Sequence, residues 1–321
     1  MTVTFADIER AAARIAAHAH VTPVLRSHSL DELAGCELHF KCENFQRVGA
    51  FKFRGACNAV WSLADDVAAR GVVTHSSGNH GAALALAAQT RGIPAHVVVP
   101  QGAVATKVAA IARYGASVHE CAPTLEARDA MAAQIQRDTG ATLIHPYTDE
   151  RVIAGQGTAA RELIREVGTL DVVCAPIGGG GLIGGSAIAA RAMLPDVELL
   201  AAEPEGAAEA HASLAHGARL TDRVPETIAD GLRATLGAVN FELLRAYRVE
   251  VVLADDAAIV AAMRLIWERL KIVVEPSSAV TLAALLRIRE RLAGKRVGVV
   301  LSGGNVDLDH LPWCAEPDLR R

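Results

Sequence analysis

The chain has 321 residues, of which 51% are hydrophobic and 21% are charged, and its formal net charge is −4. This length suits two lobes or one large α/β unit, and the composition excludes a disordered chain, a coiled coil and a collagen-like fibre. The acidic balance and an aromatic content of only 4% also predict that the protein binds no nucleic acid, because such binding needs concentrated basic charge or aromatic stacking surfaces.

The first residues predict a helix. Thr4 and Asp7 have the spacing of a capping box, and Ile8, Ala12 and Ile15 follow on one helical face. This segment carries acidic residues and a helical period, unlike a signal peptide, and the six cysteines form no CxxC pair. Free thiols and no leader predict a cytoplasmic protein.

Short apolar runs then alternate with longer amphipathic segments. The first series predicts strands at 72–74, 95–99, 117–120 and 142–144, and helices at 81–90, 103–114 and 125–137. The second series predicts strands at 172–175, 199–202 and 296–301, and helices at 155–167, 184–193, 256–270 and 277–291. Because strands separated by helices imply right-handed crossovers, we predict an α/β protein of two lobes, each a mostly parallel twisted sheet flanked by helices.

The uncharged segment 172–190 approaches the length of a membrane span. It contains six glycines and a proline, however, and glycine is unfavourable inside a helix. We therefore expect a buried strand, a turn and the start of a helix here, and no membrane partner.

Lys52 is the first candidate for chemistry. Only five of the 32 basic residues are lysines, and Lys52 lies between two phenylalanines in the sequence GAFKFRG. Burial among apolar groups disfavours the charged amine and lowers its pKa, as a Schiff-base lysine requires. The alternative is an ordinary lysine whose stem lies along an apolar surface.

Two turns lie between a predicted strand and a predicted helix. The turn SSGNH at 76–80 could expose backbone N–H groups to a carboxylate, although an ordinary capped turn explains it equally well. The four glycines at 178–181 could bind a phosphate, but they lack the lysine of a P-loop and the acidic ribose ligand of a dinucleotide site. Ser302, which follows the last strand, is a weaker signal.

An apolar-flanked lysine, a carboxylate-sized turn, a phosphate cradle and a strand-end serine are together the components of a pyridoxal-phosphate site. The sequence closely resembles the serine racemase and threonine/serine dehydratase family, in the tryptophan-synthase-β-like group of pyridoxal-phosphate enzymes. The matching stretches run in family order: TPV at 22–24, KCENFQ at 41–46, AFKFRGA at 50–56, HSSGNHG at 75–81, AGQGT at 154–158, GGGGLIGG at 178–185, ETIADGL at 226–232, WERLKIVVEPSSA at 267–279 and LSGGNVDL at 301–308.

The resemblance implies pyridoxal 5′-phosphate as the cofactor and assigns its contacts. Lys52 would attach the cofactor and then act as the base at the substrate Cα. Phe51 would lie against the cofactor, Asn79 would hydrogen-bond its ring hydroxyl, and Ser302 would face its pyridine nitrogen. The phosphate would bind the backbone of Gly178, Gly179, Gly180, Gly181 and Leu182.

The resemblance also implies how a small amino-acid substrate binds. Ser76, Ser77, Asn79 and His80 would form the turn that holds its carboxylate. Ser77 would be the second catalytic residue, on the cofactor face opposite Lys52, because family members that racemise carry serine here. Its presence makes racemisation possible without requiring it.

A divalent-cation site is implied at Glu203, Ala207 and Glu209, where two carboxylates and a backbone carbonyl suit Mg²⁺, Mn²⁺ or Ca²⁺. The racemase pattern usually has aspartate in place of Glu209. The alternative is that these are solvated acids after a strand.

The first expectation for function is an ammonia-lyase that dehydrates L-threonine or L-serine to a 2-oxo acid and ammonia. The alternatives are a 3-hydroxyaspartate dehydratase, since ERLKIVVEPSSAV with SGGNVDL also occurs in those enzymes, and a serine or aspartate racemase. The resemblance implies a large cofactor domain (1–68 and 149–321), a small substrate domain (69–148) and a homodimer. It includes no segment like the regulatory domain of biosynthetic threonine deaminase, which favours a catabolic role.

Overall fold

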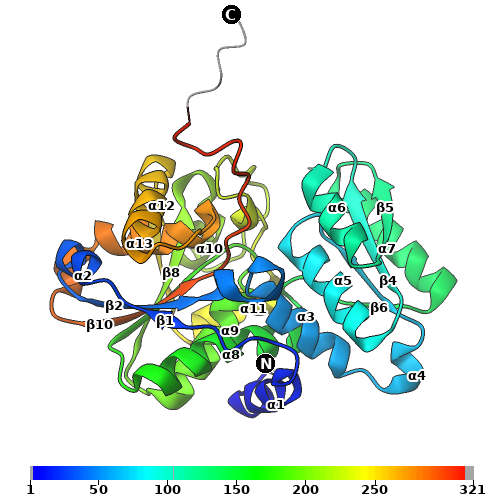
Figure 1. The fold of residues 1–321 in the computed structure, drawn as a ribbon, viewed down its shortest axis with the longest axis horizontal. Coiled ribbons are helices and arrows are strands. Elements are labelled where there is room, and N and C mark those ends of the chain that lie inside the picture. Colours follow the sequence, from blue (N-terminus) through cyan, green and yellow to red (C-terminus); the bar gives the residue numbers. More distant parts are fainter. Residues whose placement is uncertain (1–2, 104, 315–321) are drawn as a thin grey trace, which may run out of the picture.

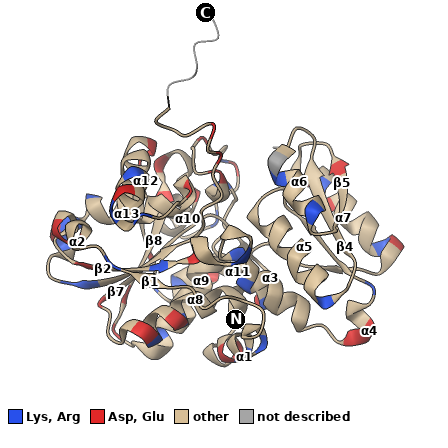
Figure 2. Cartoon of the chain, in the orientation of Figure 1, with Lys and Arg blue, Asp and Glu red and all other residues tan. Residues whose placement is uncertain are grey.

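The computed structural model describes residues 3–103 and 105–314. The chain forms two lobes, each built around a β-sheet with helices on both faces (Figure 1). This arrangement confirms the predicted two-lobed α/β architecture. In the view of Figure 2, acidic and basic residues are interspersed over both lobes. Within the described ranges, no helix is long and apolar enough to cross a membrane.

The larger sheet has six strands in the order β1-β2-β10-β7-β8-β9. Only β1 is antiparallel to its neighbour, and all other pairs are parallel. The register places Val299 of β10 between Phe40 of β2 and Cys174 of β7. The strands are β1 (Val24–Leu25), β2 (Glu37–Cys42), β7 (Val172–Pro176), β8 (Glu198–Pro204), β9 (Glu250–Ala254) and β10 (Arg296–Leu301).

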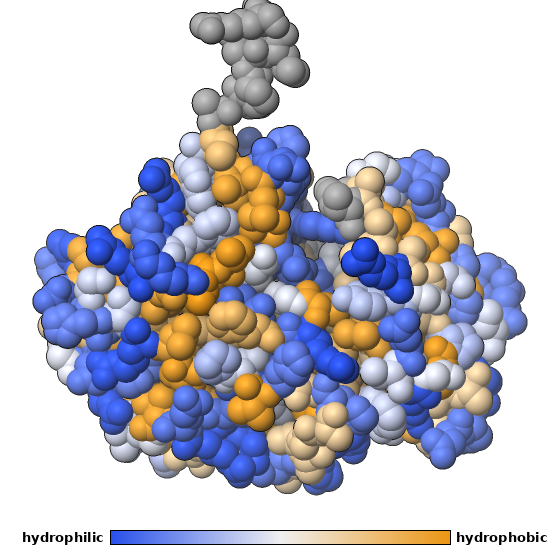
Figure 3. Space-filling view, in the orientation of Figure 1, coloured by the Kyte–Doolittle hydropathy of each residue, from blue (hydrophilic) through white to orange (hydrophobic). Residues whose placement is uncertain are grey.

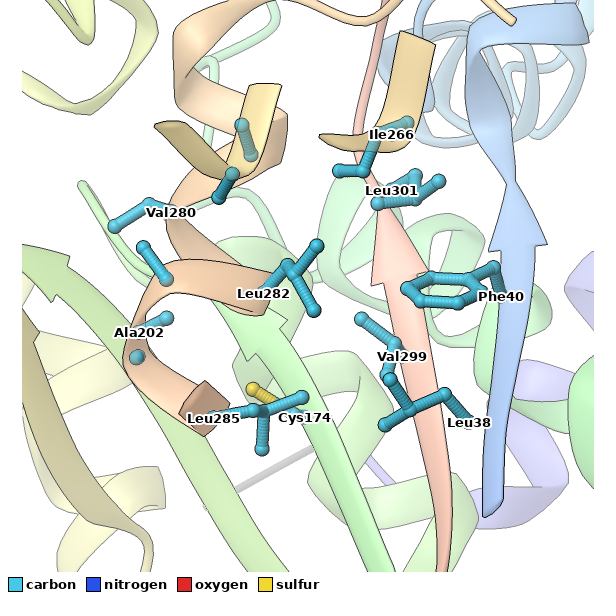
Figure 4. Packing of buried hydrophobic residues seen from close by; sticks show 14 of the residues in the cluster. Leu38, Phe40, Cys174, Ala202, Ile266, Val280, Leu282, Leu285, Val299 and Leu301 are labelled. Atoms are coloured by element: carbon cyan, nitrogen blue, oxygen red, sulfur yellow. The ribbon is translucent and has the colours of Figure 1, made fainter. Parts of the chain in front are cut away.

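Helices cover both faces of the larger sheet. One face packs against α2 (His28–Ala34), α12 (Asp256–Leu270) and α13 (Pro276–Arg287). Figure 4 shows this layer, where Phe40, Leu282 and Leu301 belong to one buried apolar cluster. The other face packs against α8 (Glu150–Val167) and α9 (Gly181–Met193), with α1 (Phe5–Ile15) outside them. The remaining helices of this lobe are α10 (Glu209–His216) and α11 (Ala238–Ala246).

The smaller sheet has four parallel strands in the order β5-β4-β3-β6. These are β3 (Val72–His75), β4 (Ala95–Pro100), β5 (Ser117–Cys121) and β6 (Thr142–Leu143). Its helices are α5 (Asn79–Arg91), α6 (Ala105–Arg113) and α7 (Leu125–Thr139), with the short α4 (Asp65–Ala68) nearby in sequence. Because parallel strands end at the same edge, the turn that follows β3 opens toward one edge of this sheet.

The helix α3 (Lys52–Trp61) connects the lobes, since it packs on α5 of the smaller lobe and on α8 of the larger one (Figure 1). The α8 contact is close: a Cβ added to Gly155 would lie 2.6 Å from the carbonyl oxygen of Arg54. On the other side, Phe53 and Ala56 belong to the apolar core of the smaller lobe. The first residue of this helix, Lys52, is therefore fixed from both sides.

Most predicted elements are present, with shifted boundaries. The capping box of Thr4 and Asp7 is confirmed, although α1 buries Ala11 with Ile8 and Ile15, and Ala12 is only half-buried. The helix predicted from 155 begins at Glu150, where the Asp149 side chain caps it, and the helix predicted to 291 ends at Arg287. The prediction omitted β1, β2, β9, α2, α3, α4, α10 and α11.

Candidate active site

The end of β10 positions the approach to Lys52. Ala50 forms a β-bridge with Gly303, and the Phe51 N–H donates to the Ser302 carbonyl at 2.9 Å. Just before, Gly49 has φ +70°, a left-handed conformation that turns the chain into α3. Two stretches far apart in sequence, AFK and LSGG, are thereby held against each other.

The Lys52 amine lies between the lobes. Its Nζ donates to the carbonyl oxygen of Pro146 at 3.0 Å and lies 5.1 Å from the centre of the Phe51 ring. Burial lowers the pKa of Lys52 to about 8, and the opposing influence is the negative charge of Glu275, which raises it. A substantial fraction of the amine is therefore neutral near physiological pH, as a Schiff-base nucleophile requires.

The turn after β3 meets the larger lobe through Asn79, the first residue of α5. Its Nδ2 donates to Glu275 Oε1 at 3.1 Å, and its Oδ1 accepts from Asn305 Nδ2 at 2.8 Å. Glu275 is 4% exposed, and burial raises its pKa to about 7. Sequence reasoning missed Glu275 as a site residue, although a carboxylate within the apolar run IVVEPSSAV was a usable signal.

The glycine loop after β7 forms an open backbone cradle. Gly180 has φ +89° and precedes α9, which begins at Gly181. The backbone N–H groups of Gly179 and Gly180 donate to no acceptor among the described residues, so they are available to an anion. A Cβ on Gly179 would lie 2.3 Å from the Tyr147 ring, which explains why glycine is needed there.

Tyr147 connects the glycine loop to Lys52. The Asn240 amide donates to the carbonyl oxygens of both Gly179 and Tyr147, at 2.6 and 2.9 Å. Tyr147 directly follows Pro146, whose carbonyl accepts from Lys52. Segment 145–148 therefore runs from the amine to the glycine loop. Sequence reasoning missed this segment, because nothing in HPYT indicates those distant partners.

Ser302 is buried at the end of β10, and its Oγ donates to the Ser277 carbonyl at 3.5 Å. The structure thus brings together Lys52, Phe51, Asn79, Ser302 and, through Tyr147, the glycine loop. Ser76 and Ser77 are half-buried in the turn next to Asn79. The assignment of each residue to a particular cofactor or substrate atom stays a prediction.

Glu203, near the end of β8, and Glu209, the first residue of α10, lie close enough for the charge of Glu209 to act on Glu203. The Glu203 carboxylate accepts from the backbone N–H groups of Ala210 and His211, at 2.7 and 2.8 Å. Glu209 accepts from Ser213 Oγ and from the Leu236 N–H, both at 2.8 Å. Within the described ranges, no three His, Cys, Asp or Glu side chains form a metal-binding group, so a cation here would also need backbone or water oxygens.

A two-lobed α/β fold with a half-buried amine and a nearby loop of backbone N–H donors is typical of an enzyme that attaches a phosphorylated cofactor through lysine. The chain belongs to the pyridoxal-phosphate dependent enzyme family, whose model matches residues 15–303. The residues present fit this cofactor, because Lys52 is neutral enough to attach an aldehyde and the Gly179 and Gly180 N–H groups lack acceptors.

Three comparisons place the chain within the family. It is 50% identical to the β-hydroxyaspartate dehydratase of Paracoccus denitrificans, with 97% of this chain and 98% of the relative covered. It is 44% identical to the L-threo-3-hydroxyaspartate ammonia-lyase of Saccharomyces cerevisiae, covering 95% and 94%. The structure of serine racemase from Dictyostelium discoideum matches with a TM-score of 0.92 at 47% identity, covering 96% of this chain and 100% of that one. These matches confirm the resemblance and the tryptophan-synthase-β-like fold.

The attachment of the cofactor can be tested with Lys52→Ala. Borohydride reduction of the wild-type holoenzyme should add the cofactor mass to the peptide that contains Lys52. The variant should show no added mass and should lose turnover by roughly a thousandfold or more, because it lacks the amine that attaches the cofactor. Lys271→Ala, at the exposed end of α12, is the matched control and should remain loaded and active. A loaded, active Lys52→Ala enzyme would refute the assignment.

A second prediction concerns the charge that Glu275 places near Lys52. In cofactor-free protein, acetic anhydride should label Lys52 with a pH midpoint near 8, because burial lowers its pKa to that value. Glu275→Gln removes the negative charge that raises this pKa, so the midpoint should move to lower pH. The exposed Glu268→Gln should leave it unchanged. A midpoint that does not move in Glu275→Gln would show that the carboxylate is too far away to act on the amine.

Proposed function

We propose that the protein is a pyridoxal-phosphate-dependent dehydratase that converts 3-hydroxyaspartate to a four-carbon 2-oxo diacid and ammonia. Identity of 50% to a β-hydroxyaspartate dehydratase across nearly the whole chain carries this proposal. The 44% identity to a 3-hydroxyaspartate ammonia-lyase supports it. These relatives favour the hydroxyaspartate alternative over the first expectation, which was dehydration of L-threonine or L-serine.

Bound pyridoxal phosphate supplies an electron sink that acidifies the substrate Cα. Lys52 would hold the cofactor and, once displaced by the substrate amine, would take the Cα proton. Asn79 would bind the ring hydroxyl and Ser302 the ring nitrogen, where a hydroxyl, unlike a carboxylate, does not enforce protonation. The N–H groups from Gly178 to Leu182 would bind the phosphate. Loss of the β-hydroxyl as water then leads to the 2-oxo acid and ammonia.

The turn 76–80 would bind the α-carboxylate. The side-chain carboxylate of 3-hydroxyaspartate then needs a partner of its own, and a cationic side chain would suit it. Arg128, in the first turn of α7, is half-buried, and among the described residues its side chain makes one hydrogen bond, from Nε to the Thr124 carbonyl at 3.3 Å. Burial lowers the pKa of His75 and raises the pKa of Tyr147, and the charge of Arg128 acts on both groups, so the guanidinium lies near Tyr147. No carboxylate within the described residues pairs with it, so we assign Arg128 to the side-chain carboxylate of the substrate.

A racemase is the second candidate, favoured by the close structural match to a serine racemase. Ser77, in the turn at 76–80, would then donate or accept the proton opposite Lys52. The deciding experiment measures 2-oxo acid and ammonia, together with chiral chromatography, on purified enzyme with the 3-hydroxyaspartate isomers, L- and D-serine and L-threonine. Oxo acid from 3-hydroxyaspartate at the highest kcat/KM supports the dehydratase. Enantiomer without oxo acid would instead establish a racemase.

The two buried carboxylates of Glu203 and Glu209 fit a divalent cation, which the Ala207 carbonyl would also bind. No cationic side chain forms an ion pair with either glutamate in the described part of the chain, and each carboxylate oxygen keeps a second lone pair beyond the hydrogen bond it accepts. A cavity of about 320 Å³ opens beside Ala207 and Glu209 with room for coordinating water. The cation stays a proposal.

A homodimer, a cytoplasmic location and the two-domain division at residues 68 and 148 also stay predictions. Several large apolar residues are exposed, and the larger lobe carries apolar surface in Figure 3. Such surface suits contact with a second subunit.

The assignment of Arg128 is tested with Arg128→Ala. Loss of one charge-assisted pair should raise KM for 3-hydroxyaspartate by roughly ten- to a hundredfold and leave KM for serine within about twofold, because serine has no second carboxylate. Arg137→Ala, on the exposed face of the same helix, is the matched control. Equal effects on both substrates would remove Arg128 from the side-chain pocket.

The cation site predicts a pH-dependent stabilisation. Without a cation, burial raises the pKa of Glu203 to about 7, so below that pH a proton competes with the metal. Millimolar Mg²⁺ should therefore raise the melting temperature more at pH 8 than at pH 6, and EDTA should reverse the gain. Glu203→Gln should abolish the gain, whereas the exposed Glu205→Gln should retain it. The same shift in Glu203→Gln as in wild type would place the cation elsewhere.

A further inference from the structure

His80 is a buried histidine with one unused nitrogen. It is 2% exposed, and its Nε2 lies 3.4 Å from the carbonyl oxygen of Ile144. Because a carbonyl only accepts, Nε2 carries the proton and Nδ1 presents a lone pair. This Nδ1 is buried and has no partner among the described residues. A buried acceptor without a donor is unfavourable, so the site should supply one.

The geometry of segment 144–146 places His80 beside Lys52. Ile144 continues the β6 pairing, since its N–H donates to the Val73 carbonyl at 2.9 Å. Pro146 begins the turn that follows β6 and is only two residues beyond Ile144. Lys52 Nζ donates to the carbonyl of Pro146, and His80 Nε2 contacts that of Ile144. The amine and the imidazole therefore lie against one three-residue segment, close enough for the charge of Lys52 to help lower the pKa of His80.

Of the three neighbouring histidines, only His80 has a buried ring nitrogen without a partner among the described residues. His145 Nδ1 accepts from the Tyr147 and Thr148 N–H groups at 3.4 and 3.2 Å, so its lone pair is used. His75 meets the edge of the His145 ring and lies 3.6 Å from the exposed Asp129. Burial and the nearby charge of Lys52 hold the pKa of His80 well below its usual range. His80 is therefore neutral, which suits an acceptor near an ammonium group.

We propose that His80 is a positioning residue whose Nδ1 accepts a hydrogen bond from the Lys52 ammonium, directly or through one water. The contact orients Nζ and stabilises its protonated form, which makes Lys52 a stronger base toward Cα. The proposal rests on the proposed role of Lys52 as the base but not on the identity of the substrate. It also implies that N–H groups of the turn, and not the His80 imidazole, bind the substrate carboxylate, because Nδ1 cannot donate.

Two substitutions distinguish the contributions of the two ring nitrogens of His80. In His80→Gln, the amide nitrogen can replace Nε2 and keep the bond to Ile144, while the acceptor at Nδ1 is lost. In His80→Asn, the amide oxygen can replace Nδ1 as acceptor, while the bond to Ile144 is lost. Cofactor-free protein is labelled with acetic anhydride across pH to obtain the Lys52 midpoint. The holoenzyme is assayed for kcat and for the equilibrium binding of glycine, which has no leaving group.

We expect the Lys52 midpoint to fall by roughly one pH unit in His80→Gln, and kcat to fall by roughly ten- to a hundredfold with glycine binding unchanged. His80→Asn should retain both the midpoint and most of kcat. Equal effects in the two variants, or an unchanged midpoint in His80→Gln, would overturn the proposal. Weaker glycine binding with an unchanged midpoint would show that His80 contacts the substrate instead.

If neither variant folds, the proposal can still be tested by a measurement on the unaltered His80. In protein labelled with ¹⁵N-histidine, the His80 Nδ1 resonance should report a hydrogen-bonded lone pair in cofactor-free wild type. Lys52→Met should move it toward the value of a free lone pair. The same resonance in both proteins would overturn the proposal. Because this experiment uses no substrate, a failed hydroxyaspartate assay would leave its result unaffected.

Discussion

The position of Lys52 depends on a buried ion network two residues along the same helix. Arg54 is fully buried and donates to both oxygens of Glu43 and both oxygens of Glu162, at distances from 2.7 to 2.8 Å. The buried Lys41 pairs with Glu162 at 2.7 Å, so two cations face two carboxylates. Burying these charges is costly, and removal of one partner leaves another uncompensated, typically at about 3–5 kcal/mol. In return, the network fixes α3 relative to β2 and α8, and the Lys52 amine belongs to the first residue of α3.

The other half of the site comes from the smaller lobe, which meets the larger one through few polar contacts. Asn79 is held between Glu275 and Asn305, and Lys107 of α6 pairs with Asp230, beside the glycine that contacts Ser277. The Lys107–Asp230 pair is partly exposed, and such pairs contribute only about 0–1 kcal/mol. Apolar contact adds to these polar pairs, because α3 packs on α5 and its residues Phe53 and Ala56 belong to the core of the smaller lobe. The larger lobe therefore carries the lysine, the glycine loop and Ser302, whereas the smaller lobe carries the turn at 76–80.

The sequence predicted those parts of the fold and site that depend on local order. Alternating runs predicted most strands and helices, and four glycines after a strand predicted the cradle. It did not predict α3, because KFRGACNAVW has a glycine and no clear amphipathic face, and its helical state depends on packing between α5 and α8. Tyr147 and His145 were missed for a similar reason, because their partners lie in other motifs and the contacts exist only in the folded chain. Glu275 did have a local signal, a carboxylate in the apolar run IVVEPSSAV, but its contact with Asn79 could not be predicted from that run.

Dehydration of serine and of 3-hydroxyaspartate would make the same demands on Lys52, the glycine loop and Ser302, so the presence of those residues cannot separate the two reactions. The difference lies in one carboxylate, and discrimination requires a group that gains free energy only when that carboxylate is present. Arg128 is suited to this because it stands on α7 of the smaller lobe, which also carries the turn at 76–80. A substrate with two carboxylates would then bind the turn at 76–80 and Arg128 together, whereas serine would make only the first contact. Because bound substrate and transition state would both make the second ion pair, specificity should appear in kcat/KM.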